Sequence, residues 1–166
     1  MKKAVLVVFV FIFALISSAS EIAPTDFLKN KKLKDLNRRA KYPIGVNVYA
    51  FGPVGLMAIT GDWFLTPKVA LELGAGIRDF DGNHAFTVGG RYHIFGNSFL
   101  NMTPYVGIYS AFHYNGSSLQ NNSLYIPFGI HKIKKSKLSW SAEVAYQKNT
   151  FFSNRLVGGF RIGYRF

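Results

Sequence analysis

The stretch Arg155-Leu-Val-Gly-Gly-Phe-Arg-Ile-Gly-Tyr-Arg-Phe166 alternates between two kinds of side chain. Counted back from the end, every second residue is apolar or aromatic, apart from one glycine. The residues between them include three arginines. Because successive side chains of a β-strand point to opposite faces, this segment predicts a strand with one apolar and one cationic face. Such a strand suits lipid on one side and a polar lumen on the other.

The same period of two runs through the chain from Pro43 onward. Turn residues such as Gly52-Pro53, Thr66-Pro67 and Asp81-Gly82-Asn83 separate the alternating segments. Short connections make consecutive strands antiparallel, and each segment is about the 9–11 residues that a tilted strand needs to cross a membrane. The chain therefore predicts an all-β fold, an eight-stranded antiparallel up-and-down transmembrane β-barrel. Its strands are expected near 43–51, 54–65, 68–79, 84–95, 103–114, 123–133, 138–148 and 155–166.

The composition of the two faces distinguishes a membrane barrel from a soluble one. A soluble lipocalin-type barrel is apolar inside and polar outside. Here the charged face also collects many glycines, among them Gly45, Gly89 and Gly159, which suit a narrow and crowded lumen. The aromatic face suits lipid. No later segment is apolar for long enough to be a spanning helix, so any crossing of a membrane is expected to use a closed barrel.

The N-terminal region has a different composition. Met1-Lys2-Lys3, an apolar run to Ile16 and the small residues of 18–20 predict a signal peptide over residues 1–20, with an uncleaved anchor as the alternative. Residues 21–42 hold seven basic and three acidic residues. Leu33, Leu36 and Ala40 would share one face if this segment were helical. It is interpreted as a basic periplasmic segment that contacts anionic head groups, or as a solvated leader.

Charge and cysteine content narrow the function classes. The formal net charge is +12, for which nucleic acid is the first partner to consider. The export signal and the strand pattern argue against nucleic acid, and anionic lipid is the better expectation. The chain has no cysteine, which excludes a lipoprotein anchor, thiolate metal sites and a cysteine nucleophile. No cofactor is expected.

Charged residues on the inward face predict a salt-bridge network. Folding the third strand onto the fourth about Asp81-Gly82 places Glu72 opposite Arg91, and folding the seventh onto the eighth places Glu143 opposite Arg161. Unpaired charges in a closed lumen are costly, so pairing is expected. Eight strands enclose room for little more than side chains, which disfavours the alternative of an ion path. The network is predicted to comprise Asp62, Glu72, Arg91, Glu143, Arg161 and Arg165.

Two positions stand apart from this pattern. Pro127 lies inside the sixth strand, where it cannot donate a ladder hydrogen bond, so a bulge or a locally broken ladder is expected there. His113 lies near the rim, and with Ser117 and Asp81 it offers the elements of a hydrolytic site. A metal site from His84, His113 and Asp81 is a weaker alternative, because the spacing is not diagnostic. A rim histidine bonded to loop groups is the simplest interpretation.

Residues 43–166 resemble the small eight-stranded outer-membrane β-barrel proteins of Gram-negative bacteria. The resemblance rests on the export signal, the alternating strands, the inward charges and the final Phe160-x-Ile162-x-Tyr164-x-Phe166. It implies that Phe160, Ile162, Tyr164 and Phe166 form a signal for the barrel assembly machinery. It also implies an outer-membrane location with both termini in the periplasm, and contact with membrane lipid and lipopolysaccharide.

Three functions follow from this sequence. The first is a non-enzymatic barrel with a structural, envelope-stabilising or surface-contact role and a lumen filled by charged side chains. The second is a lipid A-modifying acyltransferase or deacylase with a rim site near His113, as some eight-stranded outer-membrane enzymes have. The third is a soluble periplasmic binding protein with a barrel fold. Fold alone does not choose among them.

Overall fold

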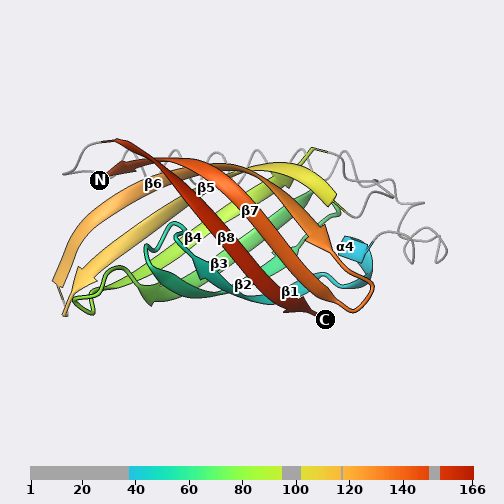
Figure 1. Ribbon diagram of the computed structural model, residues 1–166, viewed down its shortest axis with the longest axis horizontal. Coiled ribbons are helices and arrows are strands. Elements are labelled where there is room, and N and C mark those ends of the chain that lie inside the picture. The colour runs from blue at the N-terminus through green and yellow to red at the C-terminus, as the bar shows by residue number, and fades with distance from the viewer. Residues whose placement is uncertain (1–37, 95–101, 117, 150–153) are drawn as a thin grey trace.

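Eight antiparallel strands form a closed barrel in the computed structural model, and among the described residues one short helix precedes it (Figure 1). The structure describes residues 38–94, 102–116, 118–149 and 154–166. The predicted signal peptide and residues 21–37 of the predicted basic segment lie outside these ranges. The elements are α4 (Arg38–Lys41), β1 (Ile44–Ala50), β2 (Met57–Phe64), β3 (Val69–Ile77), β4 (His84–His93), β5 (Met102–Asn115), β6 (Ser118–Ile133), β7 (Leu138–Asn149) and β8 (Arg155–Arg165).

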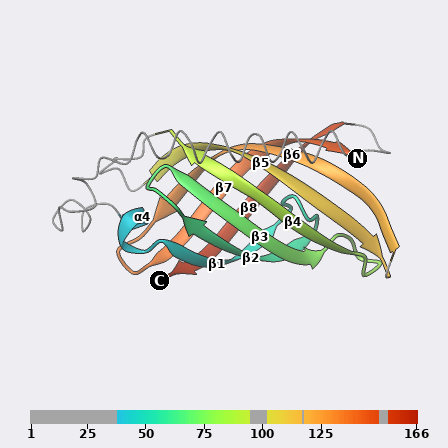
Figure 2. The same ribbon diagram turned by 180° about the vertical axis from the view of Figure 1, so that it is seen from behind.

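Each strand pairs with its neighbours in the chain, and β1 pairs with β8 to close the barrel. The predicted all-β up-and-down fold is therefore confirmed. Helix α4 lies at the same end as the C-terminus, as both views show (Figures 1 and 2). We call this the α4 end; it also carries the turns at 65–68 and 134–137. The connections at 51–56 and 78–83 lie at the opposite end. No helix in the described ranges is long and apolar enough to span a membrane.

Burial alternates along the strands as the sequence predicts. In β2, Ala58, Thr60, Asp62 and Phe64 are buried, whereas Met57, Ile59, Gly61 and Trp63 are exposed. Such alternation follows from the period of two of a β-strand. The buried residues, which include Thr60 and Asp62, face the closed interior of the barrel. Ile59, Leu73 and Leu156 are 66%, 65% and 75% exposed. The outer surface of the barrel is therefore apolar and the inside is polar.

The predicted register of two hairpins is wrong by two residues. Glu72 pairs with Gly89, and Arg91 pairs with Ala70; likewise Glu143 pairs with Gly159. In the β3–β4 hairpin the turn closes at Ile77 and His84, one residue earlier than a turn centred on Asp81-Gly82 would. An even shift keeps every side chain on its face, so the predicted inward residues stay inward.

Strands β5 and β6 differ most from the prediction. Strand β6 begins at Ser118, five residues before the predicted start, so residues 118–122 belong to a strand and not to a loop. The β5–β6 ladder is locally broken beside Pro127, because pairs run from Val106–Phe128 directly to Tyr109–Tyr125. The break expected at Pro127 is therefore present, and the register of β5 and β6 is the same on both sides of it. Pro127 still pairs with Ala145 on β7. The irregularity in register lies instead between His113 and Tyr114.

Candidate functional site in the barrel lumen

Three carboxylates and three guanidinium groups meet inside the barrel. All six side chains have no more than 2% of their surface exposed. Because buried ions need opposite charges close by, equal numbers of the two signs make this interior tolerable. The structure places together the six residues of the predicted network, Asp62, Glu72, Arg91, Glu143, Arg161 and Arg165.

Arg161 crosses the lumen to a strand that is not its neighbour. Its Nη1 lies 2.6 Å from Glu72 Oε2, which joins β8 to β3, and its Nη2 lies 3.8 Å from Glu143 Oε2. Its guanidinium carbon lies 4.2 Å from the centre of the Tyr49 ring. Since β3 and β8 share no ladder, this ion pair crosses the lumen and links two strands that are not neighbours in the barrel wall.

Arg91 and Arg165 share the carboxylate of Asp62. Arg91 Nη2 lies 3.2 Å from Asp62 Oδ2 and also 3.2 Å from Glu72 Oε2. Arg165 Nη1 donates to Asp62 Oδ2 at 2.9 Å, and Asn47 Nδ2 donates to Oδ1 at 2.7 Å. Arg91 and Glu72 pair although they are diagonal neighbours on the two strands, because an arginine side chain spans the ~7–8 Å of that diagonal.

Tyrosine hydroxyl groups surround Glu143. Tyr125 donates to Glu143 Oε1 at 2.6 Å, and the hydroxyls of Tyr49 and Tyr105 donate to the same carboxylate. Tyr109 donates to Glu72 Oε2 at 3.3 Å. Hydrogen bonds to a charged group are among the stronger ones in proteins. The alternation places these tyrosines on the inner face, but sequence reasoning did not include them because it followed only the charged residues.

Glycines make room for this packing at the wall. A Cβ added to Gly45 would lie 2.6 Å from Asp62 Oδ1 and 2.8 Å from Arg165 Nη1. One added to Gly159 would lie 3.0 Å from the Tyr49 ring and 3.1 Å from Glu143. These inward glycines are therefore the counterpart of the large arginines and tyrosines that fill the centre.

The α4 end of the lumen is closed by the residues that enter β1. Arg39 is 6% exposed and donates to Pro67 O at 2.7 Å and to the hydroxyl of Thr103. Burial, together with the charges of Arg165 and Arg91, lowers the pKa of Arg39 to about 9. Arg165 donates to Tyr42 O and Pro43 O, each at 2.9 Å. The end of the predicted basic segment thus packs on the barrel.

Two histidines pair at this end. His93 Nε2 lies 3.2 Å from His131 Nδ1, and both rings pack against Phe64. Both lie on the inward face, as the alternation of β4 and β6 requires. They contact each other and aromatic rings, and so extend the packing toward Arg39.

The structure separates the residues of the predicted rim sites. His113 is buried in the lumen with its Nε2 2.9 Å from Ser123 Oγ, whereas Asp81 is exposed in the 78–83 connection. Ser117 lies outside the described residues. His84 is exposed on the outer face, so it does not share a face with His113. Within the described ranges, no group of three His, Cys, Asp or Glu residues is placed to hold a metal ion.

Ser123 lies within the predicted strand 123–133, but the partners expected for His113 were the loop residues Ser117 and Asp81. Ser123 also accepts a hydrogen bond from Gln147 at 3.3 Å, and Gln147 accepts one from Arg155 at 3.0 Å. The alternation of β6 and β7 places Ser123 and Gln147 inward, and this signal could have identified them.

The four aromatic and aliphatic residues of the predicted assembly signal share the outer face of β8. Phe160, Ile162, Tyr164 and Phe166 are each 44–59% exposed. The rings of Tyr164 and Phe166 meet edge to face, with centroids 5.2 Å apart.

Comparison with known proteins identifies the fold. No protein-family model matches the chain, and no curated protein sequence does. Among solved structures, the N-terminal β-barrel domain of Pseudomonas aeruginosa OprF is similar, with a TM-score of 0.60 and 18% identity over 75% of this chain and 98% of that one. Two structures of de novo designed transmembrane β-barrels cover 75% of this chain at TM-scores of 0.48 and 0.49, with 17% and 18% identity. The chain has the fold of a small outer-membrane-type β-barrel.

Proposed function

We propose that this protein is a non-enzymatic outer-membrane barrel with a structural, envelope-stabilising or surface-contact role. The observation that carries the proposal is the ion pair from Arg161 to Glu72 across the lumen, held within a network of three carboxylates and three guanidinium groups. A barrel filled in this way has a rigid, packed interior in place of a water-filled channel.

The outer surface supports the membrane location. Large apolar side chains are exposed around the barrel, including Val46, Ile59, Phe128 and Val144. Soluble monomers rarely expose continuous apolar surfaces of this extent. A soluble periplasmic protein would have to cover them, whereas lipid solvates them directly.

Folding in detergent or lipid tests the location. The mature chain is expected to need detergent for solubility, to fractionate with outer membranes and to migrate differently on gels before and after heating. A mature chain that stays soluble and monomeric without detergent would show that the membrane location is wrong.

Orientation can be tested because the chain has no cysteine of its own. We place both termini in the periplasm, which puts Ser136 on the periplasmic side and Asp81 outside. A membrane-impermeant maleimide should label the Asp81→Cys variant in intact cells, and the Ser136→Cys variant only after the outer membrane is permeabilised. The reverse pattern would overturn this orientation.

A filled lumen also predicts the electrical behaviour. The reconstituted protein is expected to give no sustained single-channel currents in planar bilayers. Regular conductance steps from the wild-type protein would contradict the structural role and favour an ion path.

The geometry gives the lipid A-modifying alternative no comparable support. His113 and its partner Ser123 are 3% and 2% exposed inside the lumen, where a lipid ester has no access. Mass spectrometry of lipid A tests this directly. Lipid A is expected to be the same with the wild-type protein, with the His113→Ala variant and without the gene.

A further inference from the structure

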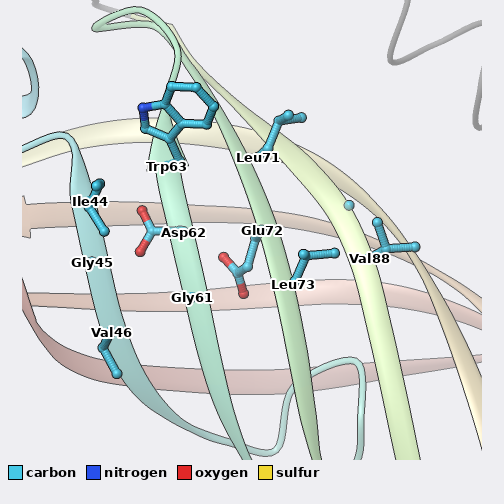
Figure 3. Close-up of a pocket in the computed structure, with 11 residues that line it drawn as sticks. Ile44, Gly45, Val46, Gly61, Asp62, Trp63, Leu71, Glu72, Leu73 and Val88 are labelled. Carbon is cyan, nitrogen blue, oxygen red and sulfur yellow. The ribbon is translucent and has the colours of Figure 1, made fainter.

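The outer wall of the barrel carries an apolar groove across β1 to β4 (Figure 3). Its volume is about 530 Å³, within the roughly 300–1,000 Å³ of ligand pockets. Ile44 and Val46 of β1, Trp63 of β2 and Leu71 and Leu73 of β3 lie around it. Asp62 and Glu72 also border the groove, but their side chains have no exposed surface. These two residues contribute only main-chain atoms to the groove, so the side chains that line it are apolar.

A single glycine creates the hollow. Gly61 lies on the outward face of β2, between Ile59 and Trp63. A Cβ added there would meet only Gly45 O, at 4.0 Å. The inward glycines make space for lumen residues, but Gly61 has no packing that requires it. The missing side chain therefore leaves a gap among large apolar residues.

Positive charge lies at one end of the groove. Lys41 precedes Ile44 by three residues, and Lys68 precedes Leu71 by three, so each lysine lies at the α4 end of a strand that borders the groove. The ammonium group of Lys41 lies 5.8 Å from the centre of the Tyr42 ring. At about 3.3 Å per residue, Lys68 starts roughly 10 Å from Leu71. The acidic residues of the described ranges lie elsewhere: Asp62, Glu72 and Glu143 are in the lumen, and Asp79 and Asp81 are at the opposite end.

We infer that this groove binds one acyl chain of an anionic phospholipid, whose phosphate lies against Lys68 and Lys41. The inference rests on the proposed membrane location. Apolar side chains hold the chain, Trp63 lies where the groove approaches the α4 end, and the lysines select an anionic head group over a zwitterionic one.

Trp63 provides a local reporter for the occupant. The chain has two tryptophans, so the Trp140→Phe variant retains Trp63 alone. This protein is reconstituted in vesicles of phosphatidylcholine and phosphatidylglycerol, with bromine on the acyl chains of one lipid at a time. Each lysine near a phosphate is expected to contribute a factor of about five, so quenching should show phosphatidylglycerol binding beside Trp63 about 25-fold more tightly than phosphatidylcholine.

Two matched pairs of variants test the groove and the charge. In the Trp140→Phe background, Gly61→Leu fills the groove and should abolish the preference. Gly158→Leu should leave it unchanged, because Gly158 is also outward, with only Glu143 O near an added Cβ, at 3.9 Å. Lys68→Gln should reduce the preference, whereas Lys148→Gln, which removes an exposed lysine near the end of β7 that lies away from α4, should not.

The outcomes separate this inference from the proposed function. Equal quenching by both lipids, with or without Gly61→Leu, would overturn the inference and leave the membrane location intact. Protection of Trp63 from both lipids, while Trp140 is quenched in a Trp63→Phe variant, would overturn it in favour of a protein partner or a second copy. Failure of every brominated lipid to quench either tryptophan would contradict the membrane location itself.

Discussion

Arg161 and Phe160 are neighbours on β8, yet they belong to different environments. Arg161 is 2% exposed and reaches across the lumen to Glu72, whereas Phe160 is 48% exposed on the outer face. Inner residues depend on particular partners from distant strands. Outer residues form an apolar surface, which the proposed membrane location would place against lipid. Substitutions on the inner face should therefore be judged by which partner they leave unpaired, and those on the outer face by polarity and depth in the membrane.

The largest effect is expected from removing one side of the cross-lumen ion pair. Arg161→Met leaves Glu72 paired with the cation of Arg91 and the hydroxyl of Tyr109, and it should cost about 3–5 kcal/mol of unfolding free energy because it unbalances a buried network. Denaturant unfolding in detergent measures this loss. The double variant Glu72→Leu/Arg161→Met should recover most of it, since Arg91 keeps Asp62. A single variant as stable as wild type would show that the ion pair contributes nothing.

A charge at the middle of the outer face should be the next most damaging. Phe128 is 61% exposed and pairs with Val144 near the centre of β7. Phe128→Lys is expected to cost about 2–4 kcal/mol of unfolding free energy in a bilayer. Leu156→Lys, at the start of β8 and so away from the middle of the outer face, is expected to cost about 0–1 kcal/mol. Unfolding in vesicles compares the two. Equal costs at both positions would argue that this face is not in a hydrocarbon layer.

Removing one hydroxyl from the tyrosine cluster should have a smaller effect. Tyr125→Phe deletes the 2.6 Å hydrogen bond to Glu143, which keeps those from Tyr49 and Tyr105. The expected cost is about 1.5–3 kcal/mol, as for a hydrogen bond to a charged group. The same change at Tyr146, on the outer face, is the control and should cost less. If the two variants lost equal stability, the inner hydroxyl would have no special role.

The smallest effect is expected outside the barrel wall. A side-chain hydrogen bond from Asn83 holds the pKa of Asp79 below its ordinary value, and Arg78 adds to this effect. A lowered folded-state pKa means that Asp79 contributes stability above its unfolded pKa and loses it as the pH falls through the folded value. Asp79→Asn should therefore lower the unfolding midpoint slightly at neutral pH and not in strong acid. A difference that grew toward low pH would contradict this assignment.

The faces of the strands were predictable, whereas their register was not. Inward positions for Glu72, Arg91 and Glu143, and likewise for Arg161, follow from the period of two within each strand segment. Opposing partners depend on where each hairpin turns, and the 78–83 connection closes one residue earlier than its Asp-Gly signal indicates. Because the resulting shift is even, the error moved partners along the strand without moving them between faces.

Some residues of the candidate site were predictable from the alternation, whereas others depended on how the strands pair. The six charged residues of the lumen network were identified from sequence, but Ser123 was not chosen as the partner of His113. Residues 118–122, rich in Asn and Ser, have the composition of a loop, yet they continue β6. Pairing with a long β5 overrides their local preference, as tertiary context does for many strands.

The sequence by itself determined the number of strands, their antiparallel order and which side chains face outward. These properties depend on alternation and short turns, which are local. The tertiary structure decided that Arg161 meets Glu72, that three tyrosines meet Glu143 and that Gly61 leaves a groove. Those contacts join strands far apart in the chain, and they exist only once β1 pairs with β8 and closure sets the distances across the lumen.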